Sequence, residues 1–158
     1  MQSLKRIYFS LFVIILLAVF GFGNAYFVFT TAKSGGTLPC FVVSGCAQVQ
    51  SSPYSRLFGI PLSLLGSLYY VGLVFLTIYF LLRVYRVTAS NFVQQVLRWW
   101  MGYVGFGFLF SLYLTFLQIF VIQALCSSCL LSFLDSLIIT TIALILWRRT
   151  LPQSTKTM

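Results

Sequence analysis

The chain has 158 residues, of which 10 are Lys or Arg, 1 is acidic and none is His, and 60% are hydrophobic. Soluble domains are about a quarter charged, so this chain cannot cover a water-facing surface, which excludes a soluble globular, a disordered and a multidomain protein. The net charge is +9, and the basic residues lie at the edges of apolar blocks rather than in one patch. That distribution also excludes an ordinary nucleic-acid binder and is typical of an integral membrane protein.

Four stretches without Lys, Arg or Glu are each long enough to cross the hydrocarbon core as a helix, and none alternates like a barrel strand. We therefore predict an all-α integral membrane protein, a bundle of four transmembrane helices in one domain over residues 1–158. The predicted helices cover residues 7–32, 57–82, 99–125 and 126–147. The last two abut, which predicts a very tight turn between them.

Lys and Arg are divided unequally between the two sides of this bundle. The N-terminus, the 83–98 loop and the C-terminal tail carry Lys5, Arg6, Arg83, Arg86, Arg98, Arg148, Arg149 and Lys156. The other side carries Lys33 and Arg56. Because short cytoplasmic loops are rich in Lys and Arg, we predict that both termini and the 83–98 loop are cytoplasmic. The 33–56 loop and the 125–126 turn are then external.

Two segments admit a second interpretation. Lys5-Arg6, an apolar run and Gly23-Asn24-Ala25 resemble a cleavable signal peptide, but the apolar run continues through Tyr26–Thr31, which favours a retained helix. In the external loop, residues 48–57 could form a short helix lying on the membrane. Pro53 fits the interior of a helix badly, so a two-part segment is the alternative.

Few side chains are left to carry chemistry. Without His or Glu, the chain cannot hold a Ser–His triad, a His-ligated metal or a pair of catalytic carboxylates, and it has no glycine-rich phosphate loop. One Asp and four cysteines remain. The cysteines all fall on the predicted external side, where disulfides can form. They are Cys40, Cys46, Cys126 and Cys129.

Cys126-Ser-Ser-Cys129 lies where the last helix is predicted to begin. The N-terminal end of a helix stabilises a thiolate, so this pair is expected to be reactive and to exchange a disulfide with the loop pair. Two structural interpretations stay open. Disulfides could staple the loops, although a spacing of two residues closes almost no chain. A four-thiolate zinc or iron–sulfur site also fits the spacings, but the external location argues against it.

The chain resembles the vitamin K epoxide reductase family in its bacterial form. The resemblance covers the whole chain in topology and residues 40–70 and 121–133 in motif. It rests on Cys40-x5-Cys46, Ser52, Phe58-Gly-Ile-Pro-Leu-Ser-Leu-Leu-Gly66 and Ala124-Leu-Cys126-Ser-Ser-Cys129. The DsbB family also has four helices and two cysteine pairs, but its Cys-x-x-Cys lies in the first external loop, whereas here that motif comes second.

The resemblance implies a thiol:quinone oxidoreductase that supports disulfide formation from a bacterial inner (cell) membrane. Cys40 and Cys46 would be the shuttle pair, attacked near Cys40 by an external thioredoxin-like or DsbA-like partner. Cys46 would exchange with Cys126, and Cys129 would reduce a quinone of the menaquinone or ubiquinone type, with no metal. Ser52 matches a family hydroxyl expected to steady the loop or the quinone site.

Four aromatic residues lie near the predicted outer ends of the helices and could wall the quinone ring, or could be interface anchors and packing. They are Phe58, Tyr69, Tyr70 and Phe133. Phe133 stands where the vertebrate enzymes have Tyr, and Gln50 stands where they have Phe. The loop cysteines are also spaced more closely. These departures put turnover of vitamin K epoxide, and sensitivity to the anticoagulants that act on the vertebrate enzymes, in doubt.

Asp135, the only acid, lies in the fourth apolar block about 9 Å deeper than Cys129 and on another face of the helix. Inside a membrane such a residue suggests a proton route to the quinone, and the alternative is a neutral acid hydrogen-bonded to a neighbouring Ser, Thr or Gln. For the whole chain, the rival to the enzyme is a non-enzymatic four-helix scaffold with structural disulfides.

Overall fold

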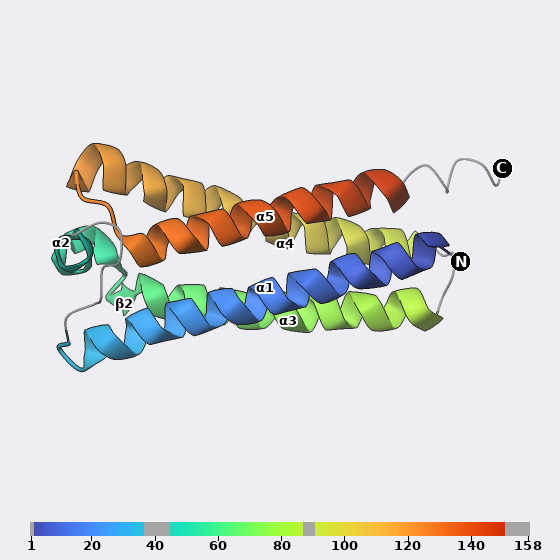
Figure 1. Cartoon of the computed structure of the whole chain (residues 1–158), viewed down its shortest axis with the longest axis horizontal. Helices are drawn as coiled ribbons and strands as arrows, with labels where there is room; N and C mark the ends of the chain where they lie inside the picture. The colour runs from blue at the N-terminus through green and yellow to red at the C-terminus, as the bar shows by residue number, and fades with distance from the viewer. Residues whose placement is uncertain (1, 37–44, 87–90, 151–158) are drawn as a thin grey trace.

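The computed structural model describes residues 2–36, 45–86 and 91–150. It contains four long helices: α1 (Gln2–Lys33), α3 (Leu62–Arg86), α4 (Asn91–Phe116) and α5 (Ser127–Thr150) (Figure 1). Each includes a stretch long and apolar enough to cross a membrane. The predicted four-helix, all-α fold class is confirmed.

The four helices surround one apolar core. Helix α1 packs against α3 and α5, and α4 packs against the same two neighbours, so the order around the bundle is α1, α3, α4, α5. Leu11 and Ile14 of α1, Leu73 of α3 and Ile139 of α5 are fully or almost fully buried. Large apolar side chains also point outward, as Phe75 does, because lipid tails solvate them as well as a core would.

The chain between α1 and α3 forms a small cap at one end of the bundle. It contains α2 (Cys46–Ser51), the 3₁₀ helix η1 (Pro53–Ser55) and two short antiparallel strands, β1 (Arg56–Leu57) and β2 (Ile60–Pro61). The two-part alternative was therefore correct. Pro53 opens η1, at a helix start where its missing N–H leaves no hydrogen bond broken.

Several predicted helix bounds differ from the structure. Helices α1 and α4 begin earlier, at Gln2 and Asn91 rather than at residues 7 and 99, because polar and basic residues continue each helix beyond its apolar block. Two further differences have a conformational cause. Helix α3 begins at Leu62 rather than at residue 57, because Phe58 and Gly59 have φ values of 52° and 84° and close a hairpin. The third membrane segment also ends early. After α4, the π-helix η2 (Leu117–Ile122) leads to Gln123, whose φ of 54° is left-handed and stops the helix.

The turn from η2 to α5 is therefore a short non-helical segment, residues 123–126, instead of a direct junction at residues 125 and 126. Figure 1 shows this turn at the same end of the bundle as α2 and β2, whereas α1 begins and α5 ends at the opposite end. The cap and the Cys-x-x-Cys motif thus lie at the same end of the bundle, which is the arrangement that disulfide exchange between them requires.

Candidate functional site

Three of the four predicted redox cysteines meet between the cap and the start of α5. Cys46 and Cys126 are each only 1% exposed and pack in one small apolar cluster with Val49 and Ala124, and Cys129 packs against it. Cys46 takes part in a disulfide bond. Cys126 and Cys129 are free thiols. Cys40 lies outside the described residues.

Gly45 allows α2 to reach this cluster. A Cβ at this position would lie 2.7 Å from the carbonyl oxygen of Leu125 and 2.9 Å from its backbone nitrogen. Any larger residue would push the start of α2 away from the turn before α5. The glycine thus lets the backbone next to Cys46 lie directly on the backbone next to Cys126.

The surroundings of Cys126 favour its thiolate form. Its pKa is lowered from 9.0 to about 6, chiefly by a hydrogen bond with the Cys129 thiol and further by the backbone N–H groups of Ser128 and Cys129, although burial opposes the shift. These N–H groups belong to the first turn of α5, which has no intrahelical acceptor for them. The helix start therefore stabilises a nucleophilic sulfur in this motif, as its sequence position predicted.

Gln118, in the π-helix η2, contacts the motif, and the sequence did not predict this contact. Its side chain is 3% exposed, and its Oε1 accepts a hydrogen bond of 3.2 Å from the backbone N–H of Cys126. Its backbone carbonyl accepts another from the N–H of Ala124, at 3.1 Å. The same side chain interacts with the Cys129 thiol. The only sequence signal was an isolated amide in an apolar run.

Asn24 of α1 holds the same motif from the other side. Its Nδ2 donates to the carbonyl oxygen of Ser128 at 2.9 Å and to Oγ of Ser132 at 3.0 Å. The sequence around this Asn predicted only a possible cleavage site. It instead bridges α1 to α5 at the redox motif.

The residues predicted to wall a quinone divide between two faces of the bundle. Tyr69 stacks on Tyr103 of α4 with ring centroids 4.9 Å apart, and Phe133 of α5 stacks on Phe108 of α4 at 6.2 Å. Tyr69 and Phe133 thus both face α4, where planar apolar walls and two phenol hydroxyls suit a quinone head group. Tyr70 turns instead toward α1 and α5.

Two further predicted residues belong to the cap. The Oγ of Ser52 donates to the carbonyl oxygen of Val49 at 2.7 Å, and the backbone carbonyl oxygen of Ser52 accepts from Oγ of Ser55 at 2.8 Å, so this residue joins α2 to η1. This bonding fits the expected role of steadying the loop. Phe58 stands at the hairpin tip and is 97% exposed, so its ring cannot wall a site inside the bundle.

Asp135 is buried in the middle of the bundle, with 4% of its surface exposed. Neither carboxyl oxygen bonds to a Ser, Thr or Gln side chain among the described residues, so the predicted alternative of such a bond is not what the structure shows. Tyr70 lies beside the carboxyl group and interacts with it electrostatically. Both groups fill the space left by the missing side chain of Gly21 on α1.

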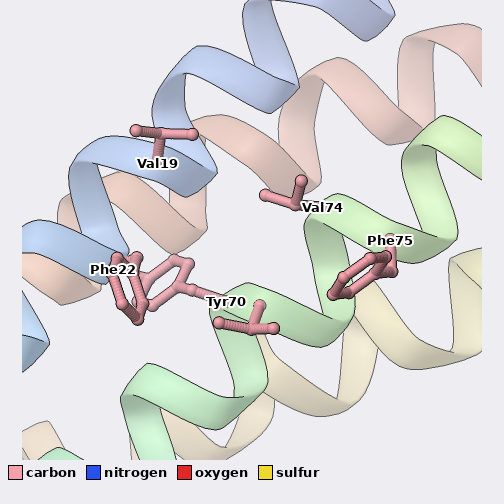
Figure 2. Close-up of a pocket in the computed structure, with 6 residues that line it drawn as sticks. Val19, Phe22, Tyr70, Val74 and Phe75 are labelled. Carbon is pink, nitrogen blue, oxygen red and sulfur yellow. The ribbon is translucent and has the colours of Figure 1, made fainter.

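A hollow of about 130 Å³ lies between α1 and α3 (Figure 2). Val19 and Phe22 of α1 face Val74 and Phe75 of α3 across it, and the ring of Tyr70 contributes to its wall. The lining is wholly apolar and includes no cysteine, so the hollow is separate from the thiol site.

The sequence matches the profile of the Vitamin K epoxide reductase family over residues 12–144. That range includes all four cysteines, the cap, and most of the four long helices. No curated protein matches the sequence.

Proposed function

Because this chain belongs to the vitamin K epoxide reductase family, whose members are membrane oxidoreductases of disulfides and quinones, we propose that it is a thiol:quinone oxidoreductase supporting disulfide formation. It is an integral membrane protein with four apolar helices. The packing of Cys46, Cys126 and Cys129 into one cluster carries the proposal, because disulfide exchange requires the sulfurs of two pairs to come together.

Electrons enter at the cap in this proposal. An external thioredoxin-like or DsbA-like protein attacks the loop disulfide near Cys40 and leaves oxidised. Reduced Cys46 then exchanges with the Cys126–Cys129 pair, and Cys126, stabilised as a thiolate by the start of α5, is the sulfur that joins the two pairs. The remaining thiol, Cys129, is left to pass the electrons on.

A quinone of the menaquinone or ubiquinone type supplies the two-electron acceptor. Tyr69, Tyr103, Phe108 and Phe133 are the side chains that would hold its head group, because they present stacked rings from three helices. Gln118 keeps Cys126 and Cys129 in place, because its side chain bonds the Cys126 backbone and interacts with the Cys129 thiol. Ser52 keeps α2 and η1 joined over the cluster.

The membrane orientation is part of the same proposal. The cap end carries Lys33 and Arg56, and the opposite end carries the larger set of basic residues, which favours an external cap and cytoplasmic termini. The cysteines then face an oxidising compartment outside a bacterial inner membrane.

The rival function is a membrane scaffold whose disulfides are only structural. Two observations favour the enzyme. Cys126 and Cys129 are free thiols at a helix start, and contacts from Ser128 and Cys129 stabilise a Cys126 thiolate, which a structural disulfide does not need. A scaffold also has no use for an amide that holds the Cys126 backbone.

The deciding experiment is quinone reduction by the purified protein in lipid, with a reduced thioredoxin-like dithiol protein as electron donor. We expect the quinone absorbance to fall as the dithiol is oxidised, and Cys129→Ser to abolish quinone reduction while disulfide exchange with the donor continues. If the wild-type protein exchanges disulfides but reduces neither menaquinone nor ubiquinone analogues, the scaffold becomes the better description.

A further inference from the structure

The only acid of the chain has no role in the proposed electron path, yet its surroundings are unusual. Asp135 is almost fully buried within a membrane-spanning helix, and the side chain that interacts with its carboxyl group is the uncharged phenol of Tyr70. A charged group there is costly unless it is paired. No Lys or Arg occurs in residues 7–32, 57–82 or 99–147, so the helices that surround it offer no counter-ion.

The groups that face Asp135 confirm an uncharged setting. Helix α3 presents Tyr70, with Tyr69 next to it, and α4 contributes Tyr103, which stacks on Tyr69. Helix α1 presents Gly21, where a Cβ would lie 2.7 Å from Oδ2 of the carboxyl group. Phenols and a bare backbone can surround a neutral carboxyl group, but they do not balance a carboxylate.

A file of polar groups connects this carboxyl group to the redox motif. Tyr70 interacts with Asp135 and also with the hydroxyl of Ser132, one helical turn nearer to the motif. Ser132 accepts a hydrogen bond from Asn24, and Asn24 donates as well to the carbonyl oxygen of Ser128, which lies inside the Cys126-Ser-Ser-Cys129 motif. The file runs along the α1-facing side of α5, whereas Phe133 occupies the side that faces α4.

We propose that Asp135 is the internal proton donor of the quinone reaction: its carboxyl group is uncharged at rest and gives up a proton when the Cys126–Cys129 dithiol is oxidised. This inference rests on the proposed function, because it assigns a residue to that reaction. Asp135 acts through the phenols of Tyr70 and Tyr69, which pack edge to face, and Tyr69 belongs to the aromatic group proposed to hold the quinone. Asp135 itself is not placed in contact with the quinone.

The proton count of the reaction calls for such a donor. With Cys126 as a thiolate and Cys129 as a thiol, forming their disulfide releases two electrons and one proton. Converting a quinone to a quinol takes up two electrons and two protons. The second proton leaves the O–H group of Asp135, which becomes a carboxylate. It is restored from the external side, where oxidation of the partner dithiol releases two protons.

The first test uses the full-length wild-type protein in lipid and needs no quinone. Asp135 is the only side-chain carboxyl group of the chain, so the infrared band of a protonated carboxyl that disappears in Asp135→Asn is unambiguous. We expect this band at neutral pH, and we expect an apolar carbodiimide, which modifies protonated carboxyls, to label Asp135. A band or label that is absent from the wild-type protein overturns the inference even if no variant folds.

The second test compares the pH dependence of quinone reduction. Asp135→Asn should lower turnover roughly tenfold or more, and its rate should fall more steeply as pH rises, because protons then come from bulk water. Tyr70→Phe, which removes the phenol beside Asp135, should change the pH dependence of the rate in the same direction as Asp135→Asn. Ser136→Ala is the matched control: among the described residues, its buried hydroxyl bonds only to the Phe133 carbonyl of its own helix, at 2.8 Å, and the variant should keep the wild-type profile.

The outcomes separate the two proposals. If the wild-type protein reduces quinone and Asp135→Asn keeps both its rate and its pH profile, Asp135 is not the donor and the proposed function stands. If the wild-type protein reduces no quinone, the proposed function fails, and the donor role fails with it whatever the infrared band shows.

Discussion

The carboxamide oxygen of Gln118 accepts a hydrogen bond from the backbone N–H of Cys126 across the turn that joins the third membrane segment to the fourth. The two residues are eight positions apart in the sequence, and the π-helix that contains Gln118 brings its amide next to the motif. This contact fixes the backbone of the cysteine proposed to join the two redox pairs. It is therefore a contact whose loss should affect exchange more than folding.

We predict that Gln118→Leu, which keeps the size of the side chain, slows disulfide exchange between the loop pair and the Cys126–Cys129 pair. The buried N–H of Cys126 loses its acceptor, which costs about 1–3 kcal/mol of stability and loosens the motif. Stopped-flow exchange with a reduced partner and thermal unfolding in detergent measure the two effects. Gln95→Ala, at an exposed position of α4, is the control. An unchanged rate of disulfide exchange in Gln118→Leu would mean that Gln118 only packs against the motif.

A second prediction concerns two glycines of α1 that are two residues apart. At Gly21 an added Cβ would overlap the Tyr70 ring and lie 2.7 Å from Oδ2 of Asp135, whereas at Gly23 it would meet no atom within 4 Å. Gly21→Ala should destabilise the bundle by about 1–3 kcal/mol. Gly23→Ala should be neutral or stabilising, by up to about 1 kcal/mol. Unfolding of the two variants in mixed micelles tests the difference, and equal stabilities would mean that α1 does not pack as described.

The helices could be predicted from the sequence because length and hydropathy alone define a membrane span. The cap could be predicted only in outline. Pro53 signalled a break in a short helix, but the hairpin that follows depends on positive φ values at Phe58 and Gly59, and the apolar run through them reads like the start of a helix. The end of the third segment was missed for the same reason, since the left-handed turn at Gln123 leaves no trace in hydropathy.

The site was predictable where it depends on residue type and spacing, and not where it depends on contacts across the bundle. Cysteine spacing was enough to propose the redox pair at the start of α5. Asn24 and Gln118 contact that pair from other helices, and nothing in their local sequence states which helix face meets the motif. Phe58 is the opposite example. Its place in the family motif predicted a residue of the quinone site, but it stands at the exposed tip of the hairpin.

The orientation of the chain leads to a third prediction. In the proposed orientation the cap is external, so a membrane-impermeant thiol reagent applied to intact, reduced cells should label all four cysteines without lysis. Cys129, which is partly exposed, should react before Cys46 and Cys126, which are each 1% exposed. A cysteine introduced at Ser154, in the basic C-terminal tail, is the control and should react only after lysis. Labelling of the native cysteines only after lysis would reverse the orientation and remove the oxidising compartment that the proposed function needs.

The pKa of Cys126 gives a prediction about pH. An ordinary thiol becomes reactive as pH rises toward 9.0, but Cys126 should be a thiolate from about pH 6 upward. Alkylation of the reduced protein, followed at Cys126 by mass spectrometry, should therefore have its midpoint near pH 6. Cys129→Ala removes the largest cause of the shift and should move that midpoint upward. A midpoint near 9 in the wild-type protein would mean that the start of α5 does not stabilise the thiolate.

The last prediction concerns the bond that links the two pairs. Cys46 and Cys126 pack in one buried cluster, so a mixed disulfide between them needs little movement of the cap. Thiol exchange passes through such a bond, which is then attacked by the remaining thiol of either pair. Cys129→Ser or Cys40→Ser removes one of these thiols and should trap the Cys46–Cys126 disulfide, detected by peptide mapping without reduction. Cys46→Ser is the control and should give no link to residue 126 through this route. A dominant Cys40–Cys126 link in Cys129→Ser would mean that the other loop sulfur delivers the electrons, and the proposed order of transfer would be wrong.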